Sequence, residues 1–142
     1  MSMNEIFSIS LITVKFNDAD PLGVVWHGNY VQYFEDARED FGAKYGIGYL
    51  EIFANGFVVP VVSLHCDYKK SLRYGDIAAV KIIYKPTLSA KINFDYEIKN
   101  HKTNEIVAVG STSQVFLEKE SMQLQLVFPE FFVTWQKKIG VV

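Results

Sequence analysis

The feature that most constrains the fold is one apolar stripe with helical spacing, set among strand-like segments. Five apolar residues recur at intervals of three or four positions: Tyr30, Phe34, Ala37, Phe41 and Tyr45. This spacing places their side chains on one face of a helix. Asn29 with Gln32 three residues later predicts a capping box at the start of that helix, and Gly46 predicts its end.

The segments around this helix have the composition of strands. Residues 6–16 are rich in β-branched side chains, and in 91–99 apolar residues alternate strictly with polar ones, which indicates a strand with one wet face. Residues 57–68 form a nearly unbroken apolar run, which predicts a strand covered on both faces, with Pro60 at an edge or bulge. Further strands are predicted over 76–85, 105–117 and 122–128.

The order of these segments predicts an α+β fold, in which an antiparallel sheet lies against one buried helix. Hairpin-like joints between successive strands exclude a parallel doubly wound sheet. Pro129 is expected at the first position of a C-terminal helix that ends near Gly140. No linker or repeat divides the sequence, so we expect a single domain over residues 1–142.

Composition excludes several classes of protein. An apolar content of 49% with a net charge of −2 excludes disorder, and a pI near 5.9 argues against nucleic-acid binding. A single cysteine, Cys66, excludes an internal disulfide framework. No apolar run approaches the roughly 18 residues of a membrane span, and the N-terminus is acidic where a signal peptide is basic. We therefore expect a cytoplasmic protein with no stable membrane insertion.

Polar chemistry concentrates in residues 16–30, between the first strand and the helix. A helix N-terminus presents unpaired N–H groups, which can stabilise negative charge on a carbonyl oxygen. A carboxylate on the preceding loop could attack that carbonyl or activate water. The alternative is that Asp18 and Asp20 serve only turn formation and the helix dipole.

A family resemblance favours the catalytic interpretation. The run Asp-Ala-Asp-Pro-Leu-Gly-Val-Val-Trp-His-Gly-Asn-Tyr over 18–30, continued by Tyr-Phe-Glu-Asp-Ala-Arg over 33–38, resembles the signature of the 4-hydroxybenzoyl-CoA thioesterase family. It is especially similar to the acyl-CoA thioesterase branch associated with Tol-Pal gene clusters. The resemblance implies a hotdog fold, a long helix wrapped by a curved antiparallel sheet. It also implies hydrolysis of an acyl-CoA to a carboxylic acid and CoA, with no metal and no cofactor beyond the CoA of the substrate.

The resemblance also assigns roles to individual residues. Asp20 matches the catalytic carboxylate, as nucleophile or general base. Asp18 is expected to anchor the loop by hydrogen bonds, with the alternative that it is the base if the register of the motif is shifted. The backbone amide near His27 polarises the thioester carbonyl, and the His27 side chain is a further candidate for proton transfer. Substrate binding is expected from residues of the loop and helix start and from a strand of the neighbouring subunit in a homodimer or homotetramer: Gly23, Val25, Trp26, Gly28, Tyr30, Val58, Val59 and Pro60.

Departures from the family pattern leave two alternatives open. Ala19 stands between the two acids, where relatives often carry Thr or Cys, and a basic pair that meets CoA phosphates in some relatives is absent before the fourth strand. One alternative is a non-catalytic hotdog module that binds acyl-CoA. The other is a thioesterase for acyl carrier protein, with a docking patch of Lys69, Lys70 and Arg73. Acyl-chain preference is left open.

Overall fold

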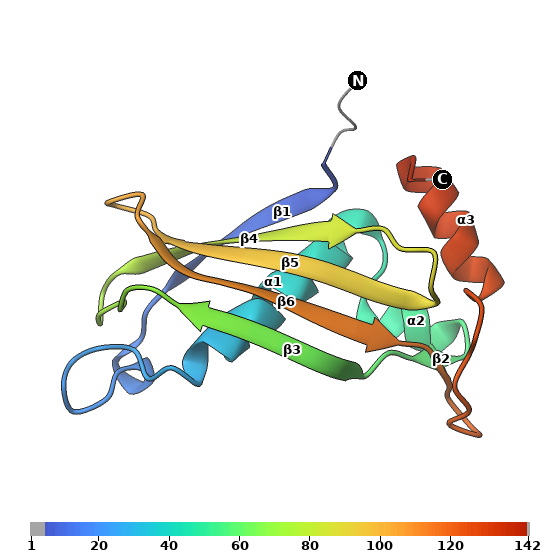
Figure 1. Ribbon diagram of the computed structural model, residues 1–142, viewed down its shortest axis with the longest axis horizontal. Helices are drawn as coiled ribbons and strands as arrows, with labels where there is room; N and C mark the ends of the chain where they lie inside the picture. Colours follow the sequence, from blue (N-terminus) through green and yellow to red (C-terminus); the bar gives the residue numbers. More distant parts are fainter. Residues whose placement is uncertain (1–4, 142) are drawn as a thin grey trace.

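The computed structural model describes residues 5–141. Its main element is a curved five-stranded antiparallel sheet that lies across the long helix α1 (Asn29–Tyr45), as Figure 1 shows. The strands follow the order β1 (Phe7–Thr13), β4 (Ile77–Lys85), β5 (Lys91–Asn100), β6 (Ile106–Val115) and β3 (Val61–Tyr68). The predicted α+β fold, with one long helix against an antiparallel sheet, is confirmed.

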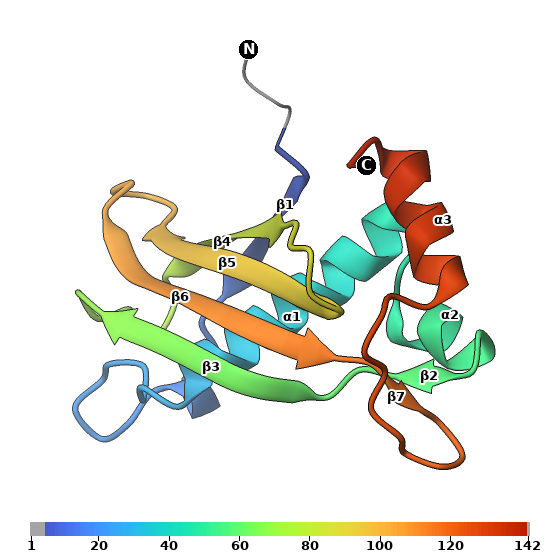
Figure 2. The same cartoon turned by 45° about the vertical axis from the view of Figure 1, so that its right-hand side comes forward.

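The remaining elements gather at one end of the sheet. Figure 2 shows α2 (Tyr49–Ala54), α3 (Glu130–Ile139) and the short pair β2 (Phe57–Val58) and β7 (Leu117–Glu118) on the same side of the molecule. A single turn of 3-10 helix, Phe16–Asp18, follows β1. The predicted C-terminal helix is confirmed: Pro129 precedes its first turn, and Gly140 ends it in the left-handed conformation.

The apolar stripe of α1 is the centre of the core, as its spacing predicts. Four of its five members are at most 3% exposed, and Tyr45 is half-buried. Phe34 stacks on Tyr96 of β5, with ring centroids 4.3 Å apart. Its ring also occupies the position beside Gly110 of β6 that a Cβ atom would need. The inward residues of β5 are buried in strict alternation, which confirms the predicted register of that strand.

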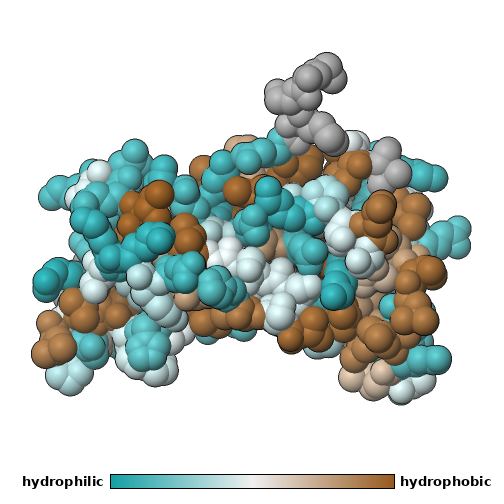
Figure 3. Space-filling model, viewed as in Figure 1, coloured by the Kyte–Doolittle hydropathy of each residue, from teal (hydrophilic) through white to brown (hydrophobic). Residues whose placement is uncertain are grey.

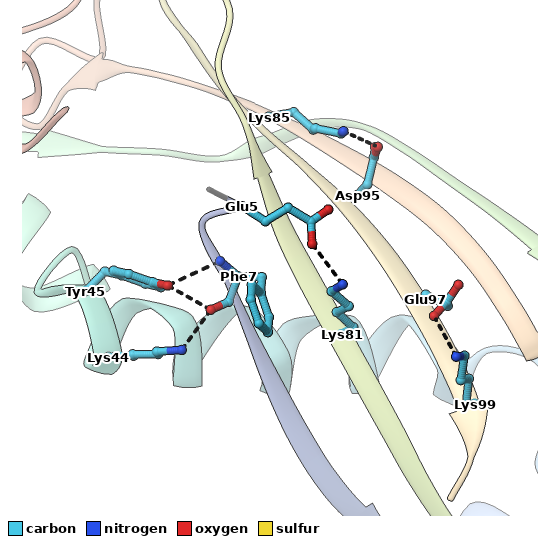
Figure 4. A network of polar contacts seen from close by, with 9 residues as sticks. All are labelled: Glu5, Phe7, Lys44, Tyr45, Lys81, Lys85, Asp95, Glu97 and Lys99. Atoms are coloured by element: carbon cyan, nitrogen blue, oxygen red, sulfur yellow. Dashed lines mark hydrogen bonds and ion pairs between the residues drawn. The ribbon is translucent and has the colours of Figure 1, made fainter. Parts of the chain in front are cut away.

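The outward face of β5 is polar, and the ion pairs drawn in Figure 4 involve this face and the lysines of the neighbouring β4. Lys85 pairs with Asp95 at 3.8 Å, and Lys99 pairs with Glu97 at 3.6 Å. The middle of this face is correspondingly hydrophilic in the space-filling view, whereas apolar residues gather near its ends (Figure 3). The wet face predicted for residues 91–99 is therefore present.

The start of α1 differs from the prediction. Gly28 is its N-cap, without a side-chain cap, so the predicted capping box of Asn29 and Gln32 is wrong. The Asn29 side chain donates instead to the Asp18 carbonyl oxygen at 2.7 Å, and Gln32 donates to Asp36 at 3.3 Å. Tertiary contacts with the preceding loop thus replace local capping at this helix start.

Two further expectations about the chain are wrong, and one helix was not predicted. The run 57–68 divides at Val59–Pro60 into β2 and β3, and β3 is an exposed sheet edge instead of a strand covered on both faces. Residues 122–128 form no strand, although Leu124 makes an isolated bridge to Leu117. The short helix α2 is an element that the periodicity did not indicate, because six residues with one buried member, Ile52, carry too weak a pattern.

Candidate active site

The loop before α1 is held by backbone pairing on both sides. Ala19 bridges to Val25, and the Asp20 N–H donates to the Val24 carbonyl oxygen at 2.8 Å. On the other side, the Val25 N–H donates to the Leu72 carbonyl oxygen at 2.7 Å. Val25 is 4% exposed, so its side chain belongs to the core. Residues 18–26 therefore form a fixed platform beside the helix start.

The carboxylate of Asp18 is occupied by structural hydrogen bonds. Its Oδ2 atom accepts from the Lys15 N–H at 2.9 Å and from the Tyr33 hydroxyl at 3.1 Å. Burial, followed by the nearby Asp18 charge, raises the pKa of Tyr33 above its ordinary value, so its hydroxyl keeps the proton that it donates. Asp18 has the contacts expected of a loop anchor.

Asp20 is arranged differently. Its side chain is half-buried, and its Oδ1 atom accepts from the Leu22 N–H at 2.9 Å. Its carbonyl oxygen accepts from the N–H of Gly23, a residue whose φ of 81° is readily adopted by glycine. Among residues 5–141, no donor is paired with Asp20 Oδ2. One carboxylate oxygen is thus available to attack a carbon or to accept a proton.

Unpaired backbone donors lie at the entry to α1. The N–H groups of Trp26, Asn29 and Tyr30 donate to the carbonyl oxygens of Asp18, Trp26 and His27, respectively, at 2.9–3.2 Å. Within the described chain, the N–H groups of His27 and Gly28 have no protein acceptor. Such donors at a helix N-terminus can stabilise negative charge on a bound carbonyl oxygen.

Aromatic side chains surround this junction. The Trp26 indole is 53% exposed and lies over Gly28, where a Cβ atom would clash with the ring. The His27 imidazole is exposed, with its centroid 5.0 Å from that of Trp26. Tyr30 is buried, and its hydroxyl accepts from the Leu72 N–H at 3.2 Å. Tyr30 therefore supports the junction from the core side.

Sequence reasoning missed Tyr33 and Tyr68 as contacts of this loop. Tyr68, the last residue of β3, donates from its hydroxyl to the His27 carbonyl oxygen at 3.1 Å. It lies 41 residues from His27 in the chain, so no local pattern links the two. Tyr33 follows Asp18 by 15 residues, and it was recognised only as part of the family motif.

The expected wall residues lie at the other end of β3. Figure 1 shows β2 at the opposite end of the strand from the loop before α1, so Val58, Val59 and Pro60 are not brought together with Asp20 of the same chain. Val59 instead borders a cavity of about 650 Å³ between α1, α2 and the sheet. The cavity has apolar walls formed by Phe41, Phe94, Phe132 and Trp135, and its polar lining groups include Arg38 and Gln114.

Other candidate groups have ordinary surroundings. Cys66 is half-buried, and this burial raises the pKa of its thiol. The described residues contain no cluster of three or more His, Cys, Asp or Glu side chains that could hold a metal ion. Lys70 is paired with Glu105 at 2.6 Å, and the Arg73 N–H donates to Asp76. No helix in residues 5–141 has the length and apolarity needed to cross a bilayer.

A long helix wrapped by a curved antiparallel sheet, with a carboxylate loop at the helix N-terminus, is the arrangement of a hotdog fold. The chain belongs to the thioesterase-like superfamily, whose family model matches residues 14–136. It is similar to a Bacillus subtilis protein named "Putative acyl-CoA thioesterase YneP", with 29% identity over 129 residues, which are 89% of this chain and 93% of that protein.

Two further relatives have names that specify a substrate. The 1,4-dihydroxy-2-naphthoyl-CoA hydrolase of Thermosynechococcus vestitus is 28% identical over 126 residues, covering 88% of this chain and 85% of that protein. The structure of a DHNA-CoA thioesterase from Staphylococcus aureus superposes with a TM-score of 0.82 at 30% identity, covering 95% and 92% of the two chains. The predictions of a hotdog fold and of a thioesterase are therefore confirmed.

Proposed function

We propose that this protein hydrolyses acyl-CoA thioesters, as a member of the 4-hydroxybenzoyl-CoA thioesterase family close to the Tol-Pal-associated branch. The observation that carries the proposal is that an unpaired carboxylate oxygen and unpaired N–H donors occur in the same short segment, residues 20–28. Asp20 Oδ2 is without a donor, and the N–H groups of His27 and Gly28 are without an acceptor within the described residues. A nucleophile or base beside an oxyanion site is what acyl transfer requires.

The proposed reaction begins with the thioester carbonyl oxygen bound by the N–H groups of His27 and Gly28. Asp20 removes a proton from water as the water oxygen bonds to the carbonyl carbon. Collapse of the tetrahedral intermediate breaks the carbon–sulfur bond, and the CoA thiolate leaves and takes up a proton. In the other route, Asp20 itself attacks the carbonyl carbon, the carbon–sulfur bond breaks and the CoA thiolate leaves, and water then hydrolyses the resulting anhydride to the carboxylic acid and free Asp20. Both routes need the same carboxylate and the same N–H donors.

We further propose that the complete site forms in a homodimer joined through the edges of two β3 strands. Val61, Val62 and Leu64 are 38–55% exposed on this edge, and an apolar edge strand with unpaired backbone groups favours pairing with another strand. Antiparallel pairing of two copies would bring β2 of one copy toward the Tyr68 end of the other. Val58, Val59 and Pro60 would then lie near the partner's Asp20.

The cavity beside Val59 supports an aromatic acyl group as the substrate class. Its volume of about 650 Å³ lies within the range of small-molecule sites, and Phe41, Phe94 and Trp135 provide flat apolar walls. Arg38 adds a cationic donor to the lining: its guanidinium donates to the Tyr96 hydroxyl at 3.2 Å and lies 4.0 Å from the Glu35 carboxylate. The similar proteins named for dihydroxynaphthoyl-CoA act on an acyl group of this kind.

Release of free thiol from a panel of aliphatic and aryl CoA thioesters tests the proposal. We expect Asp20→Asn to lower kcat by roughly 10²- to 10⁴-fold, the usual range for a lost acid–base group. Asp95→Asn, on the outward sheet face, is the matched control and should leave kcat unchanged. Equal rates for wild type and Asp20→Asn would overturn the catalytic role of Asp20.

The same panel separates the alternatives. Activity only on acyl carrier protein thioesters would indicate a carrier-protein thioesterase. Binding of acyl-CoA without turnover would indicate a non-catalytic module.

A further inference from the structure

We propose that Tyr68 is a positioning residue for the oxyanion site, because its hydroxyl orients the peptide group between His27 and Gly28. This inference rests on the proposed function, since it concerns the donors that would bind the thioester oxygen. The observation that carries it is a hydrogen bond of 3.1 Å from the Tyr68 hydroxyl to the His27 carbonyl oxygen. The same carbonyl oxygen accepts from the Tyr30 N–H at 3.2 Å, so two donors hold it.

The direction of the His27 carbonyl determines the direction of the next N–H group. The described chain contains no cis peptide bond, and in a trans peptide the C=O and the following N–H point in opposite directions. When the His27 carbonyl points toward Tyr68 and Tyr30, the Gly28 N–H points away from them and has no protein acceptor. Tyr68 therefore aims the unpaired N–H of Gly28 without touching the substrate.

A hydrogen bond is needed here because the chain itself restrains this peptide weakly. Gly28 has no Cβ atom, so its backbone has more conformations available than other residues have. The Gly28 φ of −63° and ψ of −23° are helical values, yet its N–H lies outside the helical hydrogen-bond pattern. Loss of the Tyr68 hydroxyl would leave the Tyr30 N–H, at the longer distance of 3.2 Å, as the sole restraint on the carbonyl.

Tyr68 is itself held by packing. Its ring makes edge-to-face contacts with His27 at 5.9 Å and with Tyr30 at 5.3 Å. Tyr30 is fixed in turn by the Leu72 N–H. Partial burial and, to a smaller extent, the electrostatic effect of the nearby Cys66 raise the pKa of Tyr68, so its hydroxyl remains protonated and able to donate. The contacts on the ring do not depend on the hydroxyl, so Tyr68→Phe removes the hydroxyl and its polar contacts and keeps the ring packing.

The test compares Tyr68→Phe with wild type on an aryl-CoA thioester that the wild type hydrolyses. We expect kcat to fall about tenfold, the effect of one neutral hydrogen bond, with KM unchanged. The affinity for an S-alkyl-CoA thioether, which lacks the carbonyl oxygen, should be the same in both proteins. Tyr74→Phe, which removes a hydroxyl from a tyrosine that is 61% exposed, is the control and should keep full kcat.

Three outcomes are informative. An unchanged kcat in Tyr68→Phe, with Asp20→Asn inactive, overturns the positioning role and leaves the proposed function intact. A fall in kcat that is matched by weaker thioether binding indicates general damage to the site and also overturns it. A wild-type protein that hydrolyses no thioester overturns both proposals together.

Discussion

Gly110 is the position where the distance between helix α1 and the sheet is most directly testable. A Cβ atom at this position of β6 would lie 2.5 Å from the backbone carbonyl oxygen of His65 and 2.7 Å from two ring atoms of Phe34. Ordinary contact begins at about 3.4 Å, so the neighbours would have to move by up to about 0.9 Å. The His65 oxygen belongs to the adjacent strand, and Phe34 is fully buried, so neither can move cheaply.

The expected result for Gly110→Ala is therefore a net loss of stability. Alanine is better than glycine in a strand interior by roughly 0.5–1 kcal/mol, whereas overpacking a core costs about 1–3 kcal/mol. The balance predicts a loss of about 1–2 kcal/mol. Urea unfolding followed by circular dichroism should show a lower midpoint with an unchanged slope, which is the signature of altered stability alone.

Two further variants make this prediction sharper. Ser111→Ala changes the next residue, on the opposite face of the strand, and should stay within about 0.5 kcal/mol of wild type. Phe34→Leu combined with Gly110→Ala relieves the contact with the ring but not the contact with the His65 oxygen, so the two effects should be non-additive. A Gly110→Ala protein as stable as wild type would refute the close approach of helix and sheet.

Three other predictions concern the site and the core. Gly28→Ala should displace the Trp26 indole and change its fluorescence with little loss of stability, because the Gly28 φ of −63° suits alanine; an unchanged spectrum in a Trp135→Phe background would contradict this. Asp18→Asn should lower stability by roughly 1–3 kcal/mol in thermal unfolding, since two donors lose a charged acceptor. Burial raises the pKa of Tyr30, Tyr33, Tyr84 and Tyr96 above the ordinary 10.0, so the folded state binds more protons than the unfolded state in alkaline solution. The contribution of these tyrosines to stability is complete below about pH 10 and is lost above it, so urea midpoints should fall above about pH 10, and midpoints that stay level there would count against the prediction.

The helix and the central strands could be predicted because their burial follows a simple period. The stripe of α1 repeats with the period of a helix, and Ile92, Phe94, Tyr96 and Ile98 alternate with the period of a strand. The two sets of side chains pack against each other in one core, so the local pattern and the tertiary contacts agree. The predicted capping box is absent because a tertiary contact replaces the local one: the Asn29 side chain bonds to Asp18, which belongs to a different segment.

The candidate site could be located from the sequence only in part. Residues 18–30 contain both the half-buried Asp20 and the unpaired N–H groups, and these lie close together in the chain. The different surroundings of the two acids are visible only in their hydrogen bonds, with Tyr33 for Asp18 and with Leu22 for Asp20. The restraint on His27 comes from Tyr68, whose distance in sequence hides it from any motif.

The strand β3 shows why an apolar run does not determine where a strand lies. Continuous apolar sequence is typical of strands that are covered on both faces, yet Val61, Val62 and Leu64 are exposed on a sheet edge. The sequence indicates that these apolar side chains favour burial, but it does not indicate whether the same chain or a second copy buries them. The same run begins with β2, which lies at the opposite end of β3 from the loop before α1 of the same chain (Figure 1). An edge-to-edge dimer would account for both facts, because it would cover β3 and bring the two ends of the strand together between copies.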